Sequence, residues 1–172
     1  MPALTRDAIC VIVCTSVHHG NTRKVADAFA SVAQAVVLEP GPEAYDAVRS
    51  SVLLGFGSGI FFGSHHKNLV RFVESLPALQ AGAVFLFSTS GTGYRVPRAF
   101  GLDYHRRLRR ALLRKGCSVI GEFACKGFDT YGPWGRLGGV ARGHPDDDDL
   151  ANARAFATGL VASGKLTRCL EP

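Results

Sequence analysis

The chain has 172 residues, 47% of them hydrophobic and 20% charged, a composition that excludes a disordered protein and suits one globular domain over residues 1–172. A formal net charge of +6 favours anionic partners such as phosphates, acidic proteins or nucleic acid. No apolar run reaches the roughly 20 residues of a membrane span, and the first residues lack the pattern of a signal peptide, so we expect a cytoplasmic protein with no membrane span.

Five short apolar segments, rich in β-branched and aromatic residues, predict β-strands that are buried on both faces. In chain order they are residues 8–14, 35–38, 51–56, 81–87 and 117–125. Apolar residues at helical spacing predict helices around residues 25–33, 69–76, 104–112 and 150–161. The alternation of strands and helices predicts an α/β fold in which helices cover both faces of a parallel sheet.

Four consecutive aspartates, Asp146–Asp149, stand at the start of the last predicted helix. Carboxylates are favourable near the positive end of the helix dipole, so we interpret the aspartates as residues that start this helix. A metal site is the alternative interpretation of the same run.

The loop "TSVHHGNT" (residues 15–22) follows the first predicted strand. Ligands of open parallel sheets bind outside the carboxyl ends of the strands, which makes this loop a candidate site. In it Gly20 permits a tight turn and Asn21 can cap the next helix. Ser16 and Thr22 add hydroxyl donors. Donors at a helix N-terminus favour a bound phosphate, although an ordinary capped turn would use the same residues.

Two further loops combine glycines with aromatic residues. The loop "GFGSGIFFGSHHKN" (residues 55–68) holds Phe61 and Phe62, and adjacent exposed phenylalanines need a flat partner or an apolar cover. The loop "STSGTGYR" (residues 88–95) combines hydroxyls, two glycines and Tyr94. Without a ligand, the first of these loops would fold its aromatic rings onto the core and the second would be a surface turn.

This arrangement of a phosphate-type loop and two polar, aromatic loops resembles that of the flavodoxin-like family. Gly20, Asn21 and Thr22 match the end of the family's first-loop pattern, and "YDAV" followed by "SVLLGFGSG" is similar to the family's approach to its third strand and flavin loop. The resemblance runs from about Ala8 to Val161. It implies that the domain is a three-layer α/β/α sandwich with a five-stranded parallel sheet in the order 2-1-3-4-5.

The resemblance also implies FMN as the cofactor, with its phosphate held by Ser16–Thr22. Its isoalloxazine ring would lie between the loops at Ser58–Phe62 and Thr89–Tyr94. The cofactor-binding residues implied in this way are Ser16, His18, His19, Gly20, Asn21, Thr22, Ser58, Gly59, Ile60, Phe61, Phe62, Thr89, Ser90, Gly91 and Tyr94. No catalytic residue is assigned.

Two histidine pairs lie in the candidate loops, His18 with His19 and His65 with His66. No spacing typical of a zinc site surrounds them, so we predict no metal. They are interpreted either as partners of the phosphate or of the pyrimidine end of the ring, or as exposed polar residues. With Lys67 near the ring, positive histidines would raise its redox potential above that of acidic flavodoxins.

Five arginines lie in the predicted helix that includes Arg106–Arg114. Such runs are mostly solvated faces, and the second interpretation is a docking patch for an acidic partner or an anionic substrate. Nucleic acid ranks last, because no basic and aromatic pattern of a nucleic-acid module accompanies the arginines. The other expected partner is a redox protein or a small-molecule electron acceptor.

The sequence supports two functions of different classes. The first is an FMN-binding redox flavoprotein that transfers electrons or reduces a small substrate. The long segment at residues 126–143 favours an FMN-dependent oxidoreductase with a bound substrate. The alternative is a flavin-free module that binds an anion or a partner on the same fold. No serine-hydrolase elbow, P-loop or dinucleotide motif follows any predicted strand.

Overall fold

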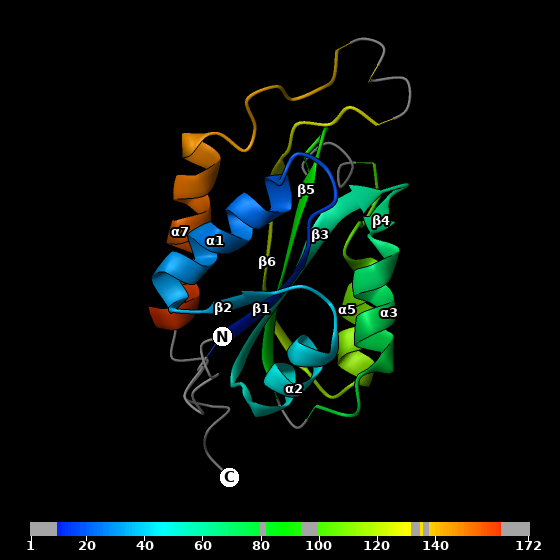
Figure 1. The fold of residues 1–172 in the computed structure, drawn as a ribbon, viewed down its shortest axis with the longest axis vertical. Helices are drawn as coiled ribbons and strands as arrows, with labels where there is room; N and C mark the ends of the chain where they lie inside the picture. Colours follow the sequence, from blue (N-terminus) through cyan, green and yellow to red (C-terminus); the bar gives the residue numbers. More distant parts are fainter. Residues whose placement is uncertain (1–9, 80–81, 94–99, 132–134, 136–137, 163–172) are drawn as a thin grey trace.

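The computed structural model describes residues 10–79, 82–93, 100–131, 135 and 138–162. Its centre is a sheet with strand order β2-β1-β3-β5-β6, in which all neighbouring strands are parallel (Figure 1). The strands are β1 (Cys10–Thr15), β2 (Val36–Leu38), β3 (Leu53–Phe61), β5 (Ala83–Ser90) and β6 (Ser118–Lys126). The short strand β4 (Ser64–His65) pairs antiparallel with β3. Thus β5 and β6 are the fourth and fifth parallel strands, and the predicted order 2-1-3-4-5 is confirmed.

Helices cover both faces of the sheet. Helices α1 (Asn21–Ala33) and α7 (Asp147–Ala162) lie side by side on one face (Figure 1). Helices α2 (Pro42–Ser50), α3 (Lys67–Ser75) and α5 (Arg106–Arg114) pack into a second core cluster on the opposite face. The predicted three-layer α/β/α sandwich is therefore confirmed. Among the described helices, none is both long and apolar enough to cross a membrane.

Glycines in β3 allow the aromatic side chains of β5 to lie across the sheet. A Cβ atom at Gly55 would lie 2.5 Å from Phe85 Cζ, and one at Gly57 would lie 2.3 Å from the ring of Phe87. Phe85 and Phe87 meet Phe29 of α1 edge-on, with ring centroids 5.4 and 5.1 Å apart. This packing fixes α1 over β3 and β5, close to the sites where these strands end.

The structure departs from the predicted elements in three places. Strand β3 continues to Phe61 and pairs with β4, so part of the expected loop at residues 55–68 is a hairpin. Its glycines suggested a loop, whereas Gly55 and Gly57 are required for packing in the sheet. Strand β5 similarly continues to Ser90. Helix α2 was not predicted, because its buried side chains are few and small: Ala44, Ala47 and Val48.

Candidate functional site

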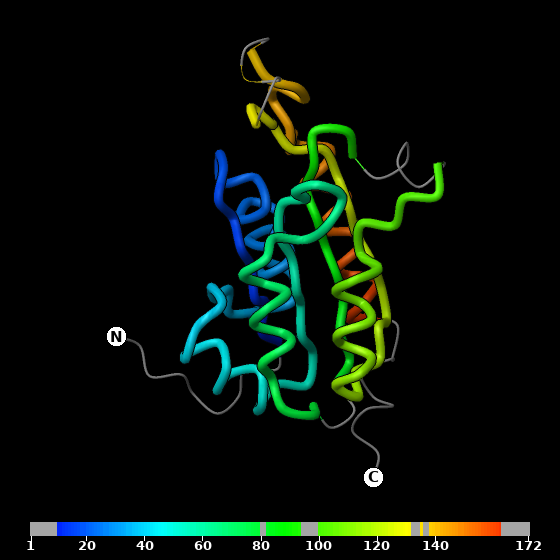
Figure 2. The backbone as a smooth tube through the Cα atoms, turned by 90° about the vertical axis from the view of Figure 1, so that its right-hand side faces the viewer, coloured from blue at the N-terminus to red at the C-terminus, as the bar shows by residue number. Residues whose placement is uncertain are grey.

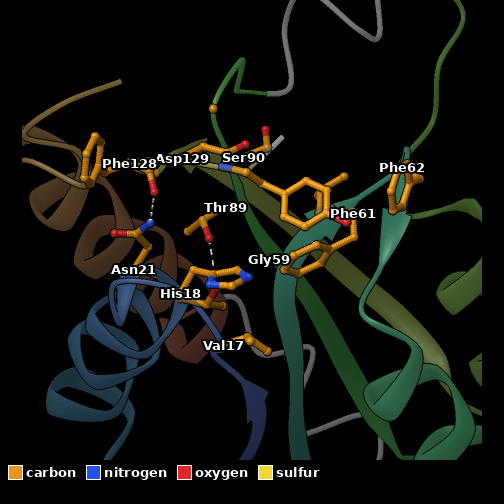
Figure 3. A pocket seen from close by; sticks show the side chains of 15 residues that line it. Val17, His18, Asn21, Gly59, Phe61, Phe62, Thr89, Ser90, Phe128 and Asp129 are labelled. Carbon is orange, nitrogen blue, oxygen red and sulfur yellow. Dashed lines mark hydrogen bonds between the residues drawn. The ribbon is translucent and has the colours of Figure 1, made fainter. Parts of the chain in front are cut away.

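The carboxyl ends of the parallel strands surround a cavity of about 460 Å³ (Figure 3). Its wall is built by parts of four segments, residues 17–22 after β1, 59–62 at the end of β3, 89–91 at the end of β5, and 127–131 after β6. This position, where the chain order of an open sheet reverses between β1 and β3, is the usual ligand site of such folds. The volume is in the range of about 300–1,000 Å³ found for small-molecule sites.

The N-terminus of α1 forms one side of the cavity through its first two residues, Asn21 and Thr22. His19 and Gly20 have φ angles of 55° and 67°, and this left-handed backbone turns the chain from β1 into α1. Gly20 occupies the N-cap without a capping side chain, and the first turn of α1 has no acidic residue. The positive end of this helix dipole is therefore not neutralised by a carboxylate of its own first turn, which suits an anion.

A buried pair of threonine hydroxyls connects the start of α1 with the end of β5. Thr22 Oγ1 and Thr89 Oγ1 lie 2.8 Å apart, and both residues also line the cavity. One hydroxyl donates to the other, and the second keeps its own hydrogen. Whichever threonine donates, the pair retains one hydroxyl donor for a ligand.

The segment after β6 closes the cavity on the α1 side. Asn21 Nδ2 donates to the carbonyl of Phe128 at 2.7 Å, and Figure 3 shows this contact at the edge of the cavity. His19 Nε2 lies 2.9 Å from Thr130 Oγ1. A Cβ atom at Gly127 would lie 3.1 Å from Asn21 Nδ2, so the close approach of these two loops depends on a glycine.

Aromatic side chains form the opposite side of the cavity. Tyr131 stands edge-on to Phe61 and Phe62, with ring centroids 6.2 and 5.7 Å apart. The ring of His18 lies 5.8 Å from that of Phe61. Phe62 is 90% exposed and stands apart at the outer edge in Figure 3. These rings offer flat apolar surface to a planar ligand.

Asp129 contributes the single carboxylate among the residues that line the cavity. Its Oδ1 accepts a hydrogen bond from the Tyr131 backbone N–H at 2.8 Å, which orients the carboxyl group. Two backbone hydrogen bonds with Val140, of 3.0 and 2.8 Å, hold Asp129 in a β-bridge. A Cβ atom at Gly91 would lie 3.3 Å from Asp129 Oδ2, so the carboxylate sits against the loop that follows β5.

The structure brings most of the predicted cofactor-binding residues together. Those in the cavity wall are His18, Asn21, Thr22, Gly59, Ile60, Phe61, Phe62, Thr89, Ser90 and Gly91. Four other predicted residues are neighbours of the wall in sequence but do not line it: Ser16, His19, Gly20 and Ser58. Ser16 Oγ instead accepts a hydrogen bond from the backbone N–H of Arg23 at 3.3 Å. Tyr94 lies outside the described residues.

Five residues of the wall are not among the predicted cofactor-binding residues. They are Val17, Gly127, Phe128, Asp129 and Tyr131. Four of them come from the segment after β6, whose unusual length was the signal that it has a function. Its sequence alone does not indicate that it folds back over the start of α1.

A second polar cluster lies beneath the cavity, on the face of the sheet that α3 and α5 cover. Ser58 of β3 and Ser88 of β5 are paired across the sheet. Ser58 Oγ lies 2.9 Å from His65 Nδ1, and Ser88 Oγ lies 2.8 Å from His105 Nε2. The two imidazole rings are 5.0 Å apart, and all four residues are buried. Their hydrogen bonds connect the sheet with β4 and α5.

The cluster extends from His105 to an ion-pair network. His105 Nδ1 lies 3.3 Å from Glu122 Oε2, and Arg109 donates to both carboxylate oxygens of Glu122 at 2.5 and 2.9 Å. Arg109 also donates to Asp103 at 2.7 and 3.2 Å. Burial opposes ionisation of Glu122, but hydrogen bonds from His105 and Arg109 outweigh it and lower the pKa to about 2. Although a Ser–His–Glu order is found in hydrolase triads, Ser88 is only 1% exposed and no substrate reaches it.

The structure corrects the interpretation of the second histidine pair. Burial, and then the neighbouring His105, hold the pKa of His65 well below its usual value, so this imidazole is neutral. His66 Nδ1 accepts the Asn68 backbone N–H at 3.3 Å and caps α3. Burial and the nearby Lys67 also lower the pKa of His66. The expectation that His65 places positive charge near the ring is therefore wrong, and the lowered pKa of His66 disfavours a positive charge there. His18 alone among the four histidines lines the cavity.

The aspartate run starts α7, as interpreted from the sequence. The backbone N–H of Asp149 donates to Asp146 Oδ1 at 2.8 Å, and that of Asp146 donates to Asp149 Oδ2 at 3.2 Å. His144 Nδ1 lies 2.6 Å from Asp149 Oδ2. The ligand-type atoms of these three side chains lie within 4.8 Å of one another, the single such group among the residues the structure describes. Capping of the helix accounts for their arrangement.

The comparison with known proteins identifies relatives. The sequence matches no protein-family model. It is similar to the uncharacterized protein MJ0298 of Methanocaldococcus jannaschii, with 36% identity over 151 residues that cover 88% of this chain and 97% of that protein. The chain belongs to the MJ0298 family.

Solved structures identify the fold of this MJ0298 family member. Oxidised Flavodoxin 2 from Bacillus cereus has a TM-score of 0.63 and 16% identity, over 91% of this chain and 99% of that one. The WrbA-like flavodoxin from Agrobacterium tumefaciens has a TM-score of 0.64 and 16% identity, over 91% and 97%. The flavodiiron protein from Giardia intestinalis has a TM-score of 0.58 and 17% identity, and the match covers 94% of this chain but 36% of that one. This member of the MJ0298 family has a flavodoxin-like fold.

Proposed function

We propose that the chain binds FMN in the cavity at the strand ends and acts as a redox flavoprotein. The observation that carries the proposal is that a helix N-terminus without its own acidic residue and an aromatic wall meet in one cavity of about 460 Å³. An amphipathic ligand with an anionic group and a planar ring system fits both sides of such a site. When bound, FMN supplies electron or hydride transfer through its ring.

The phosphate of FMN would lie at the N-terminus of α1. The backbone N–H groups near Gly20 and the spare hydroxyl donor of the Thr22–Thr89 pair are the groups that would hold it. The amide of Asn21 uses one of its two N–H hydrogens in the bond to Phe128, so this side chain shapes the loop and keeps a second donor for the phosphate. His18 would contribute its ring from the wall.

The ring system would lie between Gly59–Phe62 and Thr89–Gly91. Gly59 and Gly91 line this space with backbone atoms only. A flavin ring whose edge binds to the main chain would need such positions, because a side chain there would hold the ring away. Phe61 and Tyr131 are the rings available to cover a face of the ligand. Ser58 Oγ is engaged with His65 and with the His66 backbone N–H, so it would act only by fixing the strand before Gly59.

The bound flavin would exchange electrons with a partner protein or reduce a small substrate. The exposed edge of the cavity, at Phe62 and Tyr131, is open to solvent, which permits contact with either. Asp129 is the chain's own acidic group in the wall and would hold or repel the polar end of a substrate there. A flavin-free module that binds an anion at α1 is the alternative, and the experiment below separates the two.

The test is a titration of the flavin-free protein with FMN and with riboflavin, followed by quenching of flavin fluorescence. Charge-assisted hydrogen bonds to the phosphate contribute about 1.5–3 kcal/mol each, so FMN should bind at least about tenfold more tightly than riboflavin. Visible flavin absorption of the freshly purified protein would agree with this result. No uptake of FMN would refute the proposal and favour the flavin-free module, and equal affinities would refute the phosphate site at α1.

A further inference from the structure

Helices α3 and α5 lie side by side on the face of the molecule that Figure 2 turns toward the viewer, and they border a second hollow. Its volume is about 650 Å³. Four side chains of α5 line it, and we call it the arginine groove after them: Arg106, Arg107, Arg110 and Arg114. The fifth arginine of this helix, Arg109, points instead into the network with Glu122 and Asp103.

Most of the charge in the arginine groove is not neutralised by the part of the protein that the structure describes. Arg107 makes one exposed ion pair with Glu74, at 3.3 Å, and exposed pairs of this kind contribute little to stability. Arg106, Arg110 and Arg114 make no ion pair with any described residue. They follow one another at intervals of four residues, so their side chains form a row along about 12 Å of helix. Like charges at this spacing destabilise a helix by a few tenths of a kcal/mol, a cost that an acidic partner bound along the row would remove.

The arginine groove adjoins the cavity at the strand ends. Gly63 and Ser64 line the arginine groove, whereas Phe61 and Phe62, immediately before them, line the cavity. All four residues belong to the hairpin of β3 and β4, in which Phe62 and Gly63 form the turn. A molecule bound in the arginine groove would consequently lie beside Phe62, the most exposed aromatic ring at the rim of the cavity.

We propose that the arginine groove docks an acidic one-electron carrier protein, which exchanges electrons with the flavin in the neighbouring cavity. In each encounter a reduced carrier would lose one electron and a bound flavin would gain it, and no covalent bond would form or break. The electron-transfer part rests on the proposed function, whereas docking of the acidic partner does not. The net charge of +6 steers an acidic protein toward this chain in general, and the groove gives it a specific place to bind.

The lining of the groove favours a protein over other anions. A row of guanidinium groups about 12 Å long matches several carboxylates on an acidic surface better than it matches one compact anion. Glu74 and Asp103 stand among the arginines. Their negative charges would repel the uniformly charged backbone of a nucleic acid, whereas a protein surface of mixed charge can place a basic or neutral residue opposite them.

The test uses an acidic [2Fe–2S] ferredoxin as the probe, with calorimetry at about 50 mM salt, where charge pairs are weakly screened. Arg110→Glu/Arg114→Glu should weaken binding at least about tenfold. The matched control is Arg49→Glu/Arg154→Glu, two exposed positions on α2 and α7 outside the groove. Both double variants lower the net charge equally, and the control should weaken binding by less than about threefold.

Three results would overturn the proposal: no binding of ferredoxin to the wild-type chain, equal weakening in the two double variants, or complete displacement of ferredoxin by single-stranded oligo-dT. Binding is measured with both the FMN-titrated and the flavin-free protein, so the outcomes separate. If the chain binds ferredoxin in the groove but takes up no FMN, the docking proposal would stand and the proposed function would be refuted. FMN uptake without ferredoxin binding would refute docking alone.

Discussion

In both β3 and β5, two consecutive residues belong to different regions of the molecule, the buried polar cluster and the cavity. Ser58 and Ser88 are buried under α3 and α5, and each is hydrogen-bonded to a buried histidine. The next residue of each strand, Gly59 or Thr89, lines the cavity on the other face. Because side chains alternate along a strand, one pair of strands builds both regions.

The difference shows how polar residues at strand ends divide between stability and binding. In the buried cluster, the hydroxyls, the carboxylates and Arg109 find their partners within the protein. In the cavity, the Thr22–Thr89 pair keeps a donor and the N-terminus of α1 keeps its positive end. We therefore expect substitutions in the buried cluster to change the free energy of unfolding, and substitutions in the cavity to change the affinity for FMN.

Arg109→Met should have the largest effect, and it should act on stability. The variant leaves the carboxylates of Glu122 and Asp103 without the cation that both now share. Removal of one partner of a buried ion pair costs about 3–5 kcal/mol, and since 28% of the Arg109 side chain is exposed we expect about 2–3 kcal/mol. Urea unfolding measures this loss, with Arg106→Met as a control that should change stability by less than about 0.5 kcal/mol. A change in FMN affinity with unchanged stability would contradict the expectation that the buried cluster acts on stability and not on binding.

Gly127→Ala should weaken FMN binding about thirtyfold, which corresponds to about 2 kcal/mol. The added methyl group would lie 3.0 Å from Thr89 Cβ and 3.1 Å from Asn21 Nδ2, and so push the last loop away from α1. Fluorescence titration with FMN gives the dissociation constant. Gly159→Ala is the control, because a methyl group at this position of α7 would meet no atom of the surrounding structure within 4 Å, and its FMN affinity should equal that of the wild type.

The two adjacent phenylalanines form a matched pair for the aromatic wall. Phe61→Ala should weaken FMN binding about tenfold, or about 1.4 kcal/mol, because its ring would lose contact with the flavin. Phe62 is 90% exposed, so Phe62→Ala should leave the dissociation constant within about twofold. A larger effect of Phe62→Ala than of Phe61→Ala in the isolated protein would mean that the flavin ring lies outside the cavity described here.

A smaller effect, that of His65, concerns the pH dependence of stability near neutral pH. His65 has a lowered pKa in the folded protein, so below its ordinary value of 6.5 the unfolded chain binds a proton that the folded chain does not. Stability should therefore fall as the pH drops, by about 1 kcal/mol between pH 6.5 and about 5.5 for this group. His65→Gln should remove that part of the slope in unfolding curves measured at several pH values. An unchanged slope would show that His65 is not held neutral.

A separate loss of stability is expected in acid from Glu122. Its pKa is lowered from 4.5 to about 2, so its contribution is present above 4.5 and is lost as the pH falls toward 2. Glu122→Gln should flatten the stability profile in that window, while leaving the slope that His65 causes near neutral pH.

The sheet could be predicted from the sequence because each buried parallel strand is a continuous apolar run. Strand β1 and the core of β5 show this pattern without interruption, and both are almost entirely buried. The end of β3 could not be predicted, because the glycines that look like a loop serve to accommodate Phe85 and Phe87 from the next strand. That requirement comes from a segment about 30 residues away and leaves no local signal.

The candidate site could be predicted where its residues are local to a strand end. The segments that hold Asn21, Phe61 and Thr89 follow or complete individual strands, and they line the cavity. The contribution of Phe128 and Tyr131 depends on how a long loop folds back, which no spacing in the sequence encodes. The buried role of His65 was missed for a similar reason, because its partner Ser58 belongs to the other strand of a hairpin that was expected to be a loop.

The contact between the start of α1 and the segment after β6 has a consequence for synthesis. The bonds from Asn21 to Phe128 and from His19 to Thr130 join residues that are 107 and 111 positions apart. A nascent chain that has not yet released its sixth strand from the ribosome lacks one wall of the pocket. If the chain binds FMN as proposed, loading would wait until the segment that holds Phe128 and Thr130 has been synthesised, and a product truncated before it would be left unloaded.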